Sequence, residues 1–287
     1  MKAMIFAAGL GTRLRPITNT RPKALVEING VSLLERAFRH LRSAGVSEVI
    51  VNAHHFAERI AAFLRAQNNF GMRVEISYEE VLLDTGGGLK KAAWFFDDGK
   101  PFFVHNADVI SRLDLLRMYR FHEERNALAT LAVKPRATKR PLVFDEEGKL
   151  CGRKEVDSSF ERGQGGVNAN SYGNQNLEGT STASLRDTST ANAQTIPSDT
   201  PRTLFKGGIA QGEILELAFD GIHVISPALL DMMPEEVVFS IIATYLRLAA
   251  AGEKILAFRT DEYYWRDVGK LEELEQIAAE LARRESP

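Results

Sequence analysis

The hydrophobic and polar positions of the first 135 residues alternate between two patterns. Short apolar runs predict buried strands at Lys2–Ala8, Glu48–Ala53, Met72–Tyr78, Pro101–His105 and Ala127–Val133. Apolar residues at helical spacing predict helices over Leu33–Leu41, where Ser32 is the cap, and over Ala57–Gln67, Gly88–Phe96 and Leu113–Glu124. Strands that alternate with helices predict an α/β fold whose mostly parallel sheet is covered on both faces. Ligands of such sheets bind at the carboxyl ends of the strands.

The pattern changes in the second half of the chain. Pro141–Cys151 is typical of a hairpin, but in Gly163–Thr200 24 of 38 residues are Gly, Ser, Thr, Asn or Gln. Such a segment buries too little apolar surface to offset its ordering entropy. We therefore expect a disordered, low-complexity insertion over residues 157–205, within one domain that spans 1–287. Regular elements are predicted again after Gly212, at Phe219–Ile225, Val238–Ala251, Lys254–Arg259 and Lys270–Arg283.

Composition and charge exclude several classes of protein. The 36 Lys and Arg nearly balance the 38 Asp and Glu, so the chain has no general field to attract nucleic acid or an anionic membrane. No apolar run approaches the ~20 residues of a membrane span, and the first one stops at Gly9, too early for a signal peptide. Cys151 is the single cysteine, which excludes an intrachain disulfide and a cysteine-based metal cage. We expect a cytoplasmic protein.

The segment after the first predicted strand is suited to bind phosphate. Two glycines, Gly9 and Gly11, allow a tight turn whose N–H groups point at an anion, and Arg13 adds a planar cation. Lys23, after Pro22, supplies a second cation. A P-loop is excluded because Gly-Thr-Arg replaces Gly-Lys-Ser/Thr, and the dinucleotide fingerprint lacks its third glycine at Leu14.

An aspartate follows the predicted strand Pro101–His105 and should lie at its carboxyl end, near the glycine loop. A carboxylate there would repel a phosphate bound by that loop unless a divalent cation lay between them. Asp108 is therefore a candidate Mg²⁺ ligand, and Asp267 is a second candidate. The alternatives are that Asp108 caps the following helix and that Asp267 lies in a surface turn.

Five short motifs together resemble the sugar-1-phosphate nucleotidylyltransferases, and most closely their short bacterial members of the mannose-1-phosphate guanylyltransferase-like and N-acetylmuramate-1-phosphate uridylyltransferase-like kinds. The motifs are Ala7-Ala8-Gly9-x-Gly11-x-Arg13, Pro22-Lys23, Asp84–Gly88, Asn106–Val109 and Trp265–Gly269. The resemblance covers nearly the whole chain outside residues 157–205. It implies a Rossmann-like three-layer sandwich of the nucleotide-diphospho-sugar transferase type. It also implies Mg²⁺-dependent transfer of a nucleotide from a nucleoside triphosphate to a sugar 1-phosphate.

The resemblance also implies roles for individual residues. Arg13 and Lys23 would be catalytic, and Asp108 and Asp267 would hold the metal. Nucleotide-binding residues would be Ala8, Gly9, Leu10, Gly11, Thr12, Arg13, Thr85, Gly86 and Gly87. Sugar-binding residues would be Asn106, Asp220 and Gly221. On spacing alone, the three glycines at 86–88 are also compatible with a flexible loop, and Asp220-Gly221 with a turn that enters a strand.

Two departures from the family pattern leave details open. Ala107 stands where the family usually has glycine, and Tyr78-Glu79-Glu80 occupies the region, about six residues before the glycine pair, where many members have a glutamine that contacts the base. The sequence therefore does not identify the nucleobase or the sugar. It also contains no signal for the oligomeric state. Two other classes of protein are alternatives: a non-catalytic nucleotide-sugar-binding regulator on the same fold, and a dinucleotide-dependent oxidoreductase. A degenerate regulator should have lost Arg13, Lys23 or a metal carboxylate, and an oxidoreductase would need an acidic residue closing the second strand, where Asn52-Ala53-His54 stands.

Overall fold

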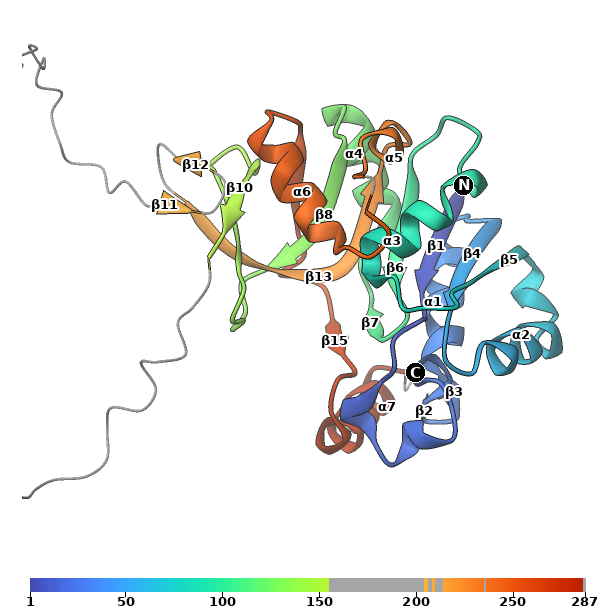
Figure 1. Cartoon of the computed structure of the whole chain (residues 1–287). Helices are drawn as coiled ribbons and strands as arrows, with labels where there is room; N and C mark the ends of the chain where they lie inside the picture. The colour runs from blue at the N-terminus through green and yellow to red at the C-terminus, as the bar shows by residue number, and fades with distance from the viewer. Residues whose placement is uncertain (155–203, 206–207, 210–213, 235, 286–287) are drawn as a thin grey trace, which may run out of the picture. The chain divides into compact units, whose positions relative to one another are not determined.

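Nine strands form the central sheet of the part of the chain that the computed structural model describes, residues 1–154, 204–205, 208–209, 214–234 and 236–285 (Figure 1). The strands of this sheet are β1 (Lys2–Phe6), β4 (Glu48–Ala53), β5 (Arg73–Tyr78), β6 (Phe102–Asn106), β8 (Ala129–Lys134), β9 (Leu142–Phe144), β10 (Leu150–Arg153), β13 (Leu215–Ile225) and β14 (Ile255–Arg259). Short strand pairs lie outside it: β2 (Glu27–Ile28) with β3 (Val31–Ser32), β7 (Val109–Ser111) with β15 (Trp265–Asp267), and β11 (Leu204–Phe205) with β12 (Gly208–Ile209).

Most strands of the sheet run in one direction. Strands β5, β4, β1 and β6 are parallel neighbours in that order. Strand β13 is antiparallel to β6, β8 and β9, and β8 pairs in parallel with β14. Because β8 and β9 are both antiparallel to β13, they run in the same direction as β6. The predicted α/β fold with a mostly parallel sheet is therefore confirmed.

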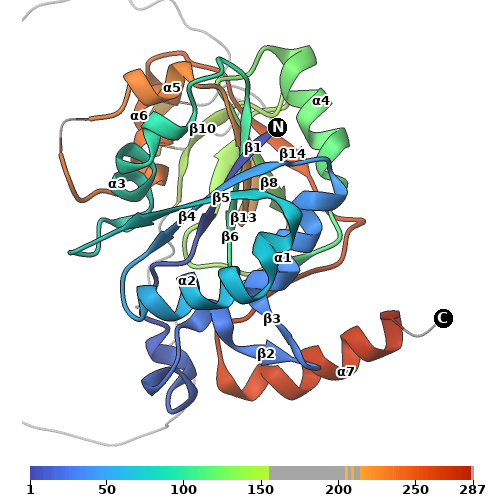
Figure 2. The same cartoon turned by 90° about the vertical axis from the view of Figure 1, so that its right-hand side faces the viewer.

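Helices cover both faces of this sheet. They are α1 (Leu33–Ser43), α2 (Ala57–Ala66), α3 (Asp84–Lys91), α4 (Leu115–Arg125), α5 (Ala228–Asp231) and α6 (Ile241–Ala250), while α7 (Leu274–Glu285) belongs to neither face. Alternate residues of β1 separate the two cores: Ile5 packs with α1, α2 and α4, and Met4 packs with α3, α5 and α6. In Figure 2, α3 and α6 lie to the left of the sheet and α4 to its right. The three layers predicted from the alternating pattern are thus present.

A third apolar cluster fixes α7 beneath the carboxyl edge of the sheet. Ile277 and Leu281 of α7 pack with Ile28, Leu14 and Val268. The β2–β3 pair, the opening loop and the segment after β15 therefore share one small core. Figure 1 shows α7 and this strand pair together at the lower end of the sheet.

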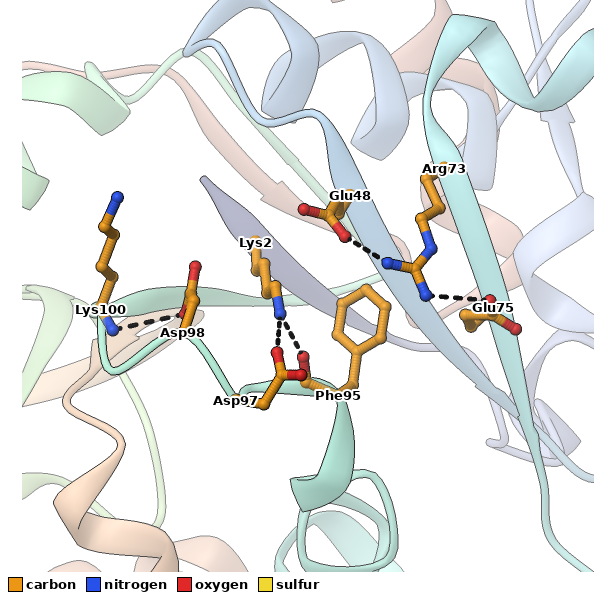
Figure 3. A network of polar contacts seen from close by, with 8 residues as sticks. All are labelled: Lys2, Glu48, Arg73, Glu75, Phe95, Asp97, Asp98 and Lys100. Carbon is orange, nitrogen blue, oxygen red and sulfur yellow. Dashed lines mark hydrogen bonds and ion pairs between the residues drawn. The ribbon is translucent and has the colours of Figure 1, made fainter.

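The amino ends of the parallel strands carry a charged network (Figure 3). Lys2, Glu48 and Arg73 are in register across β1, β4 and β5. The buried Lys2 ammonium donates to the carbonyl of Phe95 at 2.7 Å and pairs with Asp97, while Arg73 Nη1 lies 2.9 Å from Glu48 Oε2. Each of these three charged residues therefore pairs with a side chain of opposite charge. We assign the network to stabilisation of the edge opposite to the predicted ligand edge.

The predicted insertion and a possible membrane span remain to be compared with the described residues. The predicted insertion, residues 157–205, lies outside the described residues apart from Leu204–Phe205, so its expected disorder stays a prediction. Among the helices of the described ranges, none combines the length and apolar composition that a bilayer crossing needs.

Candidate active site

The opening loop follows β1 at the carboxyl edge of the sheet. Its first residue is anchored by two neighbouring strands: the Ala7 N–H donates to Asn52 Oδ1 of β4 at 2.7 Å, and the Ala107 N–H donates to the carbonyl of Phe6 at 3.0 Å. No atom lies within 4 Å of the place where a Gly9 side chain would begin. Leu10 is exposed. The predicted phosphate loop therefore has an open face.

Gly11 brings this loop against the second predicted cation. It has a left-handed φ of 64°, and a Cβ at this position would lie 2.9 Å from Lys23 Cβ. Thr18 Oγ1 donates to the carbonyl of Gly11 at 2.8 Å, which ties the returning chain to the loop. A glycine is required here for both reasons, backbone conformation and close approach. Lys23 is thus held beside the loop.

The two predicted metal ligands lie at one short antiparallel strand pair: Asp108 directly precedes β7, and Asp267 is the last residue of β15. Asp267 is opposite Val109 in the β15–β7 pair, and the Val268 N–H donates to the carbonyl of Asp108 at 2.9 Å. Burial and the nearby Asp108 carboxylate both raise the pKa of Asp267 above its ordinary value. The pairing brings together two acids that are far apart in the sequence, as predicted. It also removes both alternatives: Asp114 caps α4 through the Arg117 N–H at 2.9 Å, and Asp267 lies in a strand.

Cations surround this acidic pair. Lys23 forms an ion pair with Asp108 and is almost buried, with 12% of its side chain exposed. Arg13 lies over Gly269, where a Cβ would be 3.1 Å from Arg13 Nη1. Lys23, Arg13 and Arg136 all act to lower the pKa of Asp267, against the effect of burial. Arg13, Arg136 and Asp267 line a common cavity of about 680 Å³.

The donor set suits Mg²⁺. No cluster of three or more metal-ligating side chains occurs in the described ranges. The two adjacent carboxylates match the requirement of Mg²⁺, which usually takes one or two protein carboxylates and completes its shell with phosphate oxygens and water. Two carboxylates this close, one of them with a raised pKa, repel one another unless a cation neutralises them.

The predicted base side differs from expectation. The helix α3 begins at Asp84, so the glycines lie inside it and do not precede it. The N–H groups of Gly86 and Gly87 donate to the carbonyl of Phe239 at 2.9 and 3.2 Å, and Ile241 N–H donates to Thr85 Oγ1 at 3.0 Å. The backbone of Val237–Phe239 therefore packs against Gly86 and Gly87, two of the glycines predicted to bind the nucleotide. A nucleotide contact of Thr85, Gly86 or Gly87 stays a prediction, without an open glycine face to support it.

The close packing around Gly87 predicts that a larger residue at this position lowers the stability of the protein. A Cβ on Gly87 would lie 2.1 Å from the carbonyl oxygen of Val237, so the backbone must move. We expect Gly87→Ala to lower the free energy of unfolding by about 2–3 kcal/mol. Gly9→Ala is the matched control, because its Cβ meets no atom within 4 Å. Urea unfolding of both variants checks this, and equal midpoints would show that the glycine is not needed for packing.

The structure brings together two of the residues predicted for the sugar side, Asn106 and Gly221. Strand β13 has an irregular register between Phe219 and His223, and Gly221 within it has a φ of 78°. A Cβ on Gly221 would lie 2.7 Å from Asn106 Nδ2, so Asn106 and Gly221 are neighbours. Their contact with a sugar stays a prediction.

Asp220 is not placed to contact a sugar. Only 1% of it is exposed, and its carboxylate accepts a hydrogen bond from Thr260 Oγ1 at 2.5 Å and pairs with Arg136 at 3.5 Å. Burial raises the pKa of Asp220. The motif Asp220-Gly221 gave no indication of these partners, because Arg136 and Thr260 lie in the segments that follow β8 and β14, far away in the sequence. The predicted sugar contact is therefore not supported for this residue.

A buried polar relay that the sequence reasoning missed connects the loop to the base side. Asn52 Nδ2 donates to Glu79 Oε1 at 2.7 Å, and the Leu83 N–H donates to Glu79 Oε2 at 3.1 Å. Since Asn52 also holds Ala7, the relay fixes the opening loop relative to the segment before α3. The available signal was the polar Asn52 in the otherwise apolar run of β4, and Arg136 had no comparable signal.

With this geometry established, comparison with known proteins identifies the family. Residues 2–144, about half of the chain, match the family model described as nucleotidyl transferase. The chain belongs to the nucleotidyl transferase family.

Two curated relatives are similar to part of this chain. The chain is 49% identical over 111 residues to N-acetylmuramate alpha-1-phosphate uridylyltransferase of Caulobacter vibrioides, covering 38% of this chain and 46% of that one. It is 34% identical over 189 residues to UTP--glucose-1-phosphate uridylyltransferase of Synechocystis sp., covering 60% of this chain and 48% of the relative. The chain thus spans about half the length of these curated relatives.

The fold is shared with a solved structure along the whole length. A putative glucose-1-phosphate thymidylyltransferase from Bacillus anthracis superposes with a TM-score of 0.70 at 14% identity, covering 100% of this chain and 97% of that one. At this identity the likeness concerns the fold alone.

Proposed function

We propose that this protein is a sugar-1-phosphate nucleotidylyltransferase that joins a nucleoside triphosphate and a sugar 1-phosphate to give a nucleoside diphosphate sugar and pyrophosphate. One observation carries the proposal: the acidic pair Asp108 and Asp267 lies beside Lys23 and Arg13, at the edge where the glycine loop has its open face. Two acids and two cations around a phosphate loop suit a reaction between two phosphates.

The chain's own groups would position the two substrates. The N–H groups of the loop from Ala8 to Thr12 would bind the β- and γ-phosphates, assisted by the Arg13 guanidinium. Lys23, which pairs with Asp108 in the structure, would turn to the phosphates that react and reduce their mutual repulsion. Positioning of this kind supplies most of the catalysis in phosphoryl and nucleotidyl transfer.

Asp108 and Asp267 would hold Mg²⁺. Bound there, the ion would neutralise phosphate charge in the transition state. A bound cation would also explain why two partly buried acids lie close together at the proposed phosphate-binding edge, where they would otherwise repel the substrate.

The reaction needs no protein nucleophile. A phosphate oxygen of the sugar 1-phosphate attacks the α-phosphorus of the triphosphate, and the bond from that phosphorus to the bridging oxygen of the β-phosphate breaks. The electron pair leaves with pyrophosphate. The attacking oxygen is already ionised at neutral pH, so no base has to remove a proton.

A substrate matrix tests the proposal. Four nucleoside triphosphates are combined with glucose 1-phosphate, mannose 1-phosphate and N-acetylmuramate 1-phosphate, each with Mg²⁺ and with chelator. We expect pyrophosphate and a nucleoside diphosphate sugar of matching mass in at least one combination, and none with chelator. Tight binding of a nucleotide sugar without turnover in any combination would contradict catalysis and favour a regulatory protein.

A further inference from the structure

Arg136, which follows β8, is held rigidly although it lies at the cavity surface. Its Nε lies 3.5 Å from Asp220 Oδ1, its Nη2 donates to the carbonyl of Phe219 at 2.6 Å, and its guanidinium lies 4.2 Å from the centre of the Trp265 ring. About a third of the side chain, 32%, remains exposed. Three contacts thus fix the guanidinium while part of it stays open to a ligand.

The buried Asp220 organises this arrangement. Its carboxylate is fixed by Thr260 Oγ1, and its backbone carbonyl accepts a hydrogen bond from Trp265 Nε1 at 2.8 Å. Asp220 therefore holds Arg136 directly through its side chain, and through its backbone carbonyl it orients Trp265, which lies against the Arg136 guanidinium. A buried carboxylate is costly unless it is paired, and here the pairing places a cation at a defined point.

The cavity joins Arg136 to the reaction site. Arg13, Asp267 and Lys139 line it as well, and Arg136 lies close enough to Asp267 to lower the pKa of that carboxyl. A planar guanidinium in this position matches the oxygens of a phosphate, to which it can donate two parallel hydrogen bonds.

A second cation that follows a strand of the sheet already has a partner. Lys154, after β10, pairs with Glu216 Oε1 at 2.7 Å. Lys154 is not among the described residues that line the cavity. It therefore cannot replace Arg136 without breaking that pair and moving.

We propose that Arg136 binds the phosphate of the second substrate, the sugar 1-phosphate, and that Asp220 is the residue that positions it. This inference rests on the proposed function, because it takes the triphosphate to lie on the opening loop. It assigns Asp220 a structural purpose in place of the sugar contact that its motif suggested. The sugar phosphate would then lie between Arg136 and the acidic pair.

Binding of two probes, glucose 1-phosphate and inorganic phosphate, tests the inference without turnover. Calorimetry on the full chain should show that Arg136→Met weakens binding of both probes at least about 10-fold, a typical loss for a charge-assisted hydrogen-bond pair. Arg136→Lys, which keeps the charge and loses the fork, should lie between Arg136→Met and the unchanged chain. Lys154→Met is the matched control and should bind as the unchanged chain does.

Steady-state kinetics separate the roles of Arg136 and Asp220. With the best substrate pair, Arg136→Met should raise the KM for the sugar phosphate and leave the KM for the triphosphate nearly unchanged. Asp220→Asn should raise the same KM less, and should have no further effect when added to Arg136→Met, because it acts through that residue. An additive effect of Asp220→Asn would overturn the positioning role.

The outcomes distinguish this inference from the proposed function. Arg136-dependent phosphate binding in a chain that never releases pyrophosphate would refute the proposed function and retain the anion site. Turnover with unchanged probe binding and KM in Arg136→Met and Arg136→Lys would refute the site and retain the function.

Discussion

Asp108→Asn is expected to reduce pyrophosphate release by about 10³-fold or more, since it removes one of two carboxylates from the predicted metal site. The substitution keeps the shape of the side chain and removes its charge. It loses the ion pair with Lys23 but also relieves repulsion with Asp267. We therefore expect the melting temperature to change by no more than about 2 °C.

The exposed Asp261 provides a matched control. It pairs with Arg259 at the surface, and Asp261→Asn should leave both activity and melting temperature unchanged. Initial rates of pyrophosphate release and thermal unfolding of both variants check the prediction. Lys23→Ala should also lower the rate of pyrophosphate release. Full activity in Asp108→Asn and in Lys23→Ala would show that the site lies elsewhere.

Acidification is expected to destabilise the protein strongly between pH 6.5 and about 4. Burial lowers the pKa of His105 and His223 to about 3 and the pKa of His122 to about 4, so all three are neutral in the folded state at pH 5. In the unfolded chain they protonate near pH 6.5. Their contribution to stability is therefore complete above pH 6.5 and is lost as the pH falls.

The linkage gives the size of this effect. Between pH 7.5 and pH 5, each histidine that protonates only in the unfolded chain lowers the free energy of unfolding by about 2 kcal/mol. Three such histidines lower it by about 6 kcal/mol, a large share of a typical unfolding free energy. The raised pKa values of Asp220 and Asp267 act in the opposite direction, because these carboxyls take up protons first in the folded state. The net loss should be smaller than the sum for the histidines.

A single variant isolates one histidine. His122 contacts Thr130 Oγ1 at 3.0 Å and Ser226 Oγ at 2.9 Å, bonds that glutamine can replace. His122→Gln should reduce the difference in unfolding free energy between pH 7.5 and pH 5.0 by about 2 kcal/mol, as measured by urea titration. His55→Gln, at an exposed position, should leave the difference unchanged. An unchanged difference in His122→Gln would contradict the assignment.

Local signals were sufficient for most of the parallel sheet. The run Glu48–Ala53 forms a strand with the predicted bounds, and Ser32 caps α1 by accepting the Glu35 N–H at 3.1 Å, as predicted. Both patterns are decided by neighbours in the sequence: a buried strand by its apolar run, and a helix start by the cap. Elements of this kind can be read without knowledge of the tertiary structure.

Other elements depend on contacts between segments that are distant in the sequence, and these could not be predicted from local patterns. The β7–β15 pair, with three residues in each strand, has no local pattern, yet it brings Asp108 and Asp267 together. Helix α3 begins at Asp84, four residues before the predicted start, because Phe239 accepts the N–H groups of Gly86 and Gly87, residues that form helices poorly by themselves.

The candidate site shows the same division. Asp108 and Lys23 could be proposed because each follows a recognisable local signal, a buried strand or a glycine loop with a proline. The burial of Asp220 could not, since it depends on Thr260 and Arg136. A motif indicated candidate residues for the site, but only the packing showed which of their side chains are buried and already paired.

The most direct test of the central claim is the position of a bound cation. Crystals of the full chain with Mn²⁺ in place of Mg²⁺, and with a triphosphate whose α–β bridge is methylene, would allow the metal to be located by its anomalous scattering. We expect one peak in contact with the carboxylates of both Asp108 and Asp267 and with phosphate oxygens. Bound nucleotide with the metal peak on other residues, or with no metal near either aspartate, would contradict the claim.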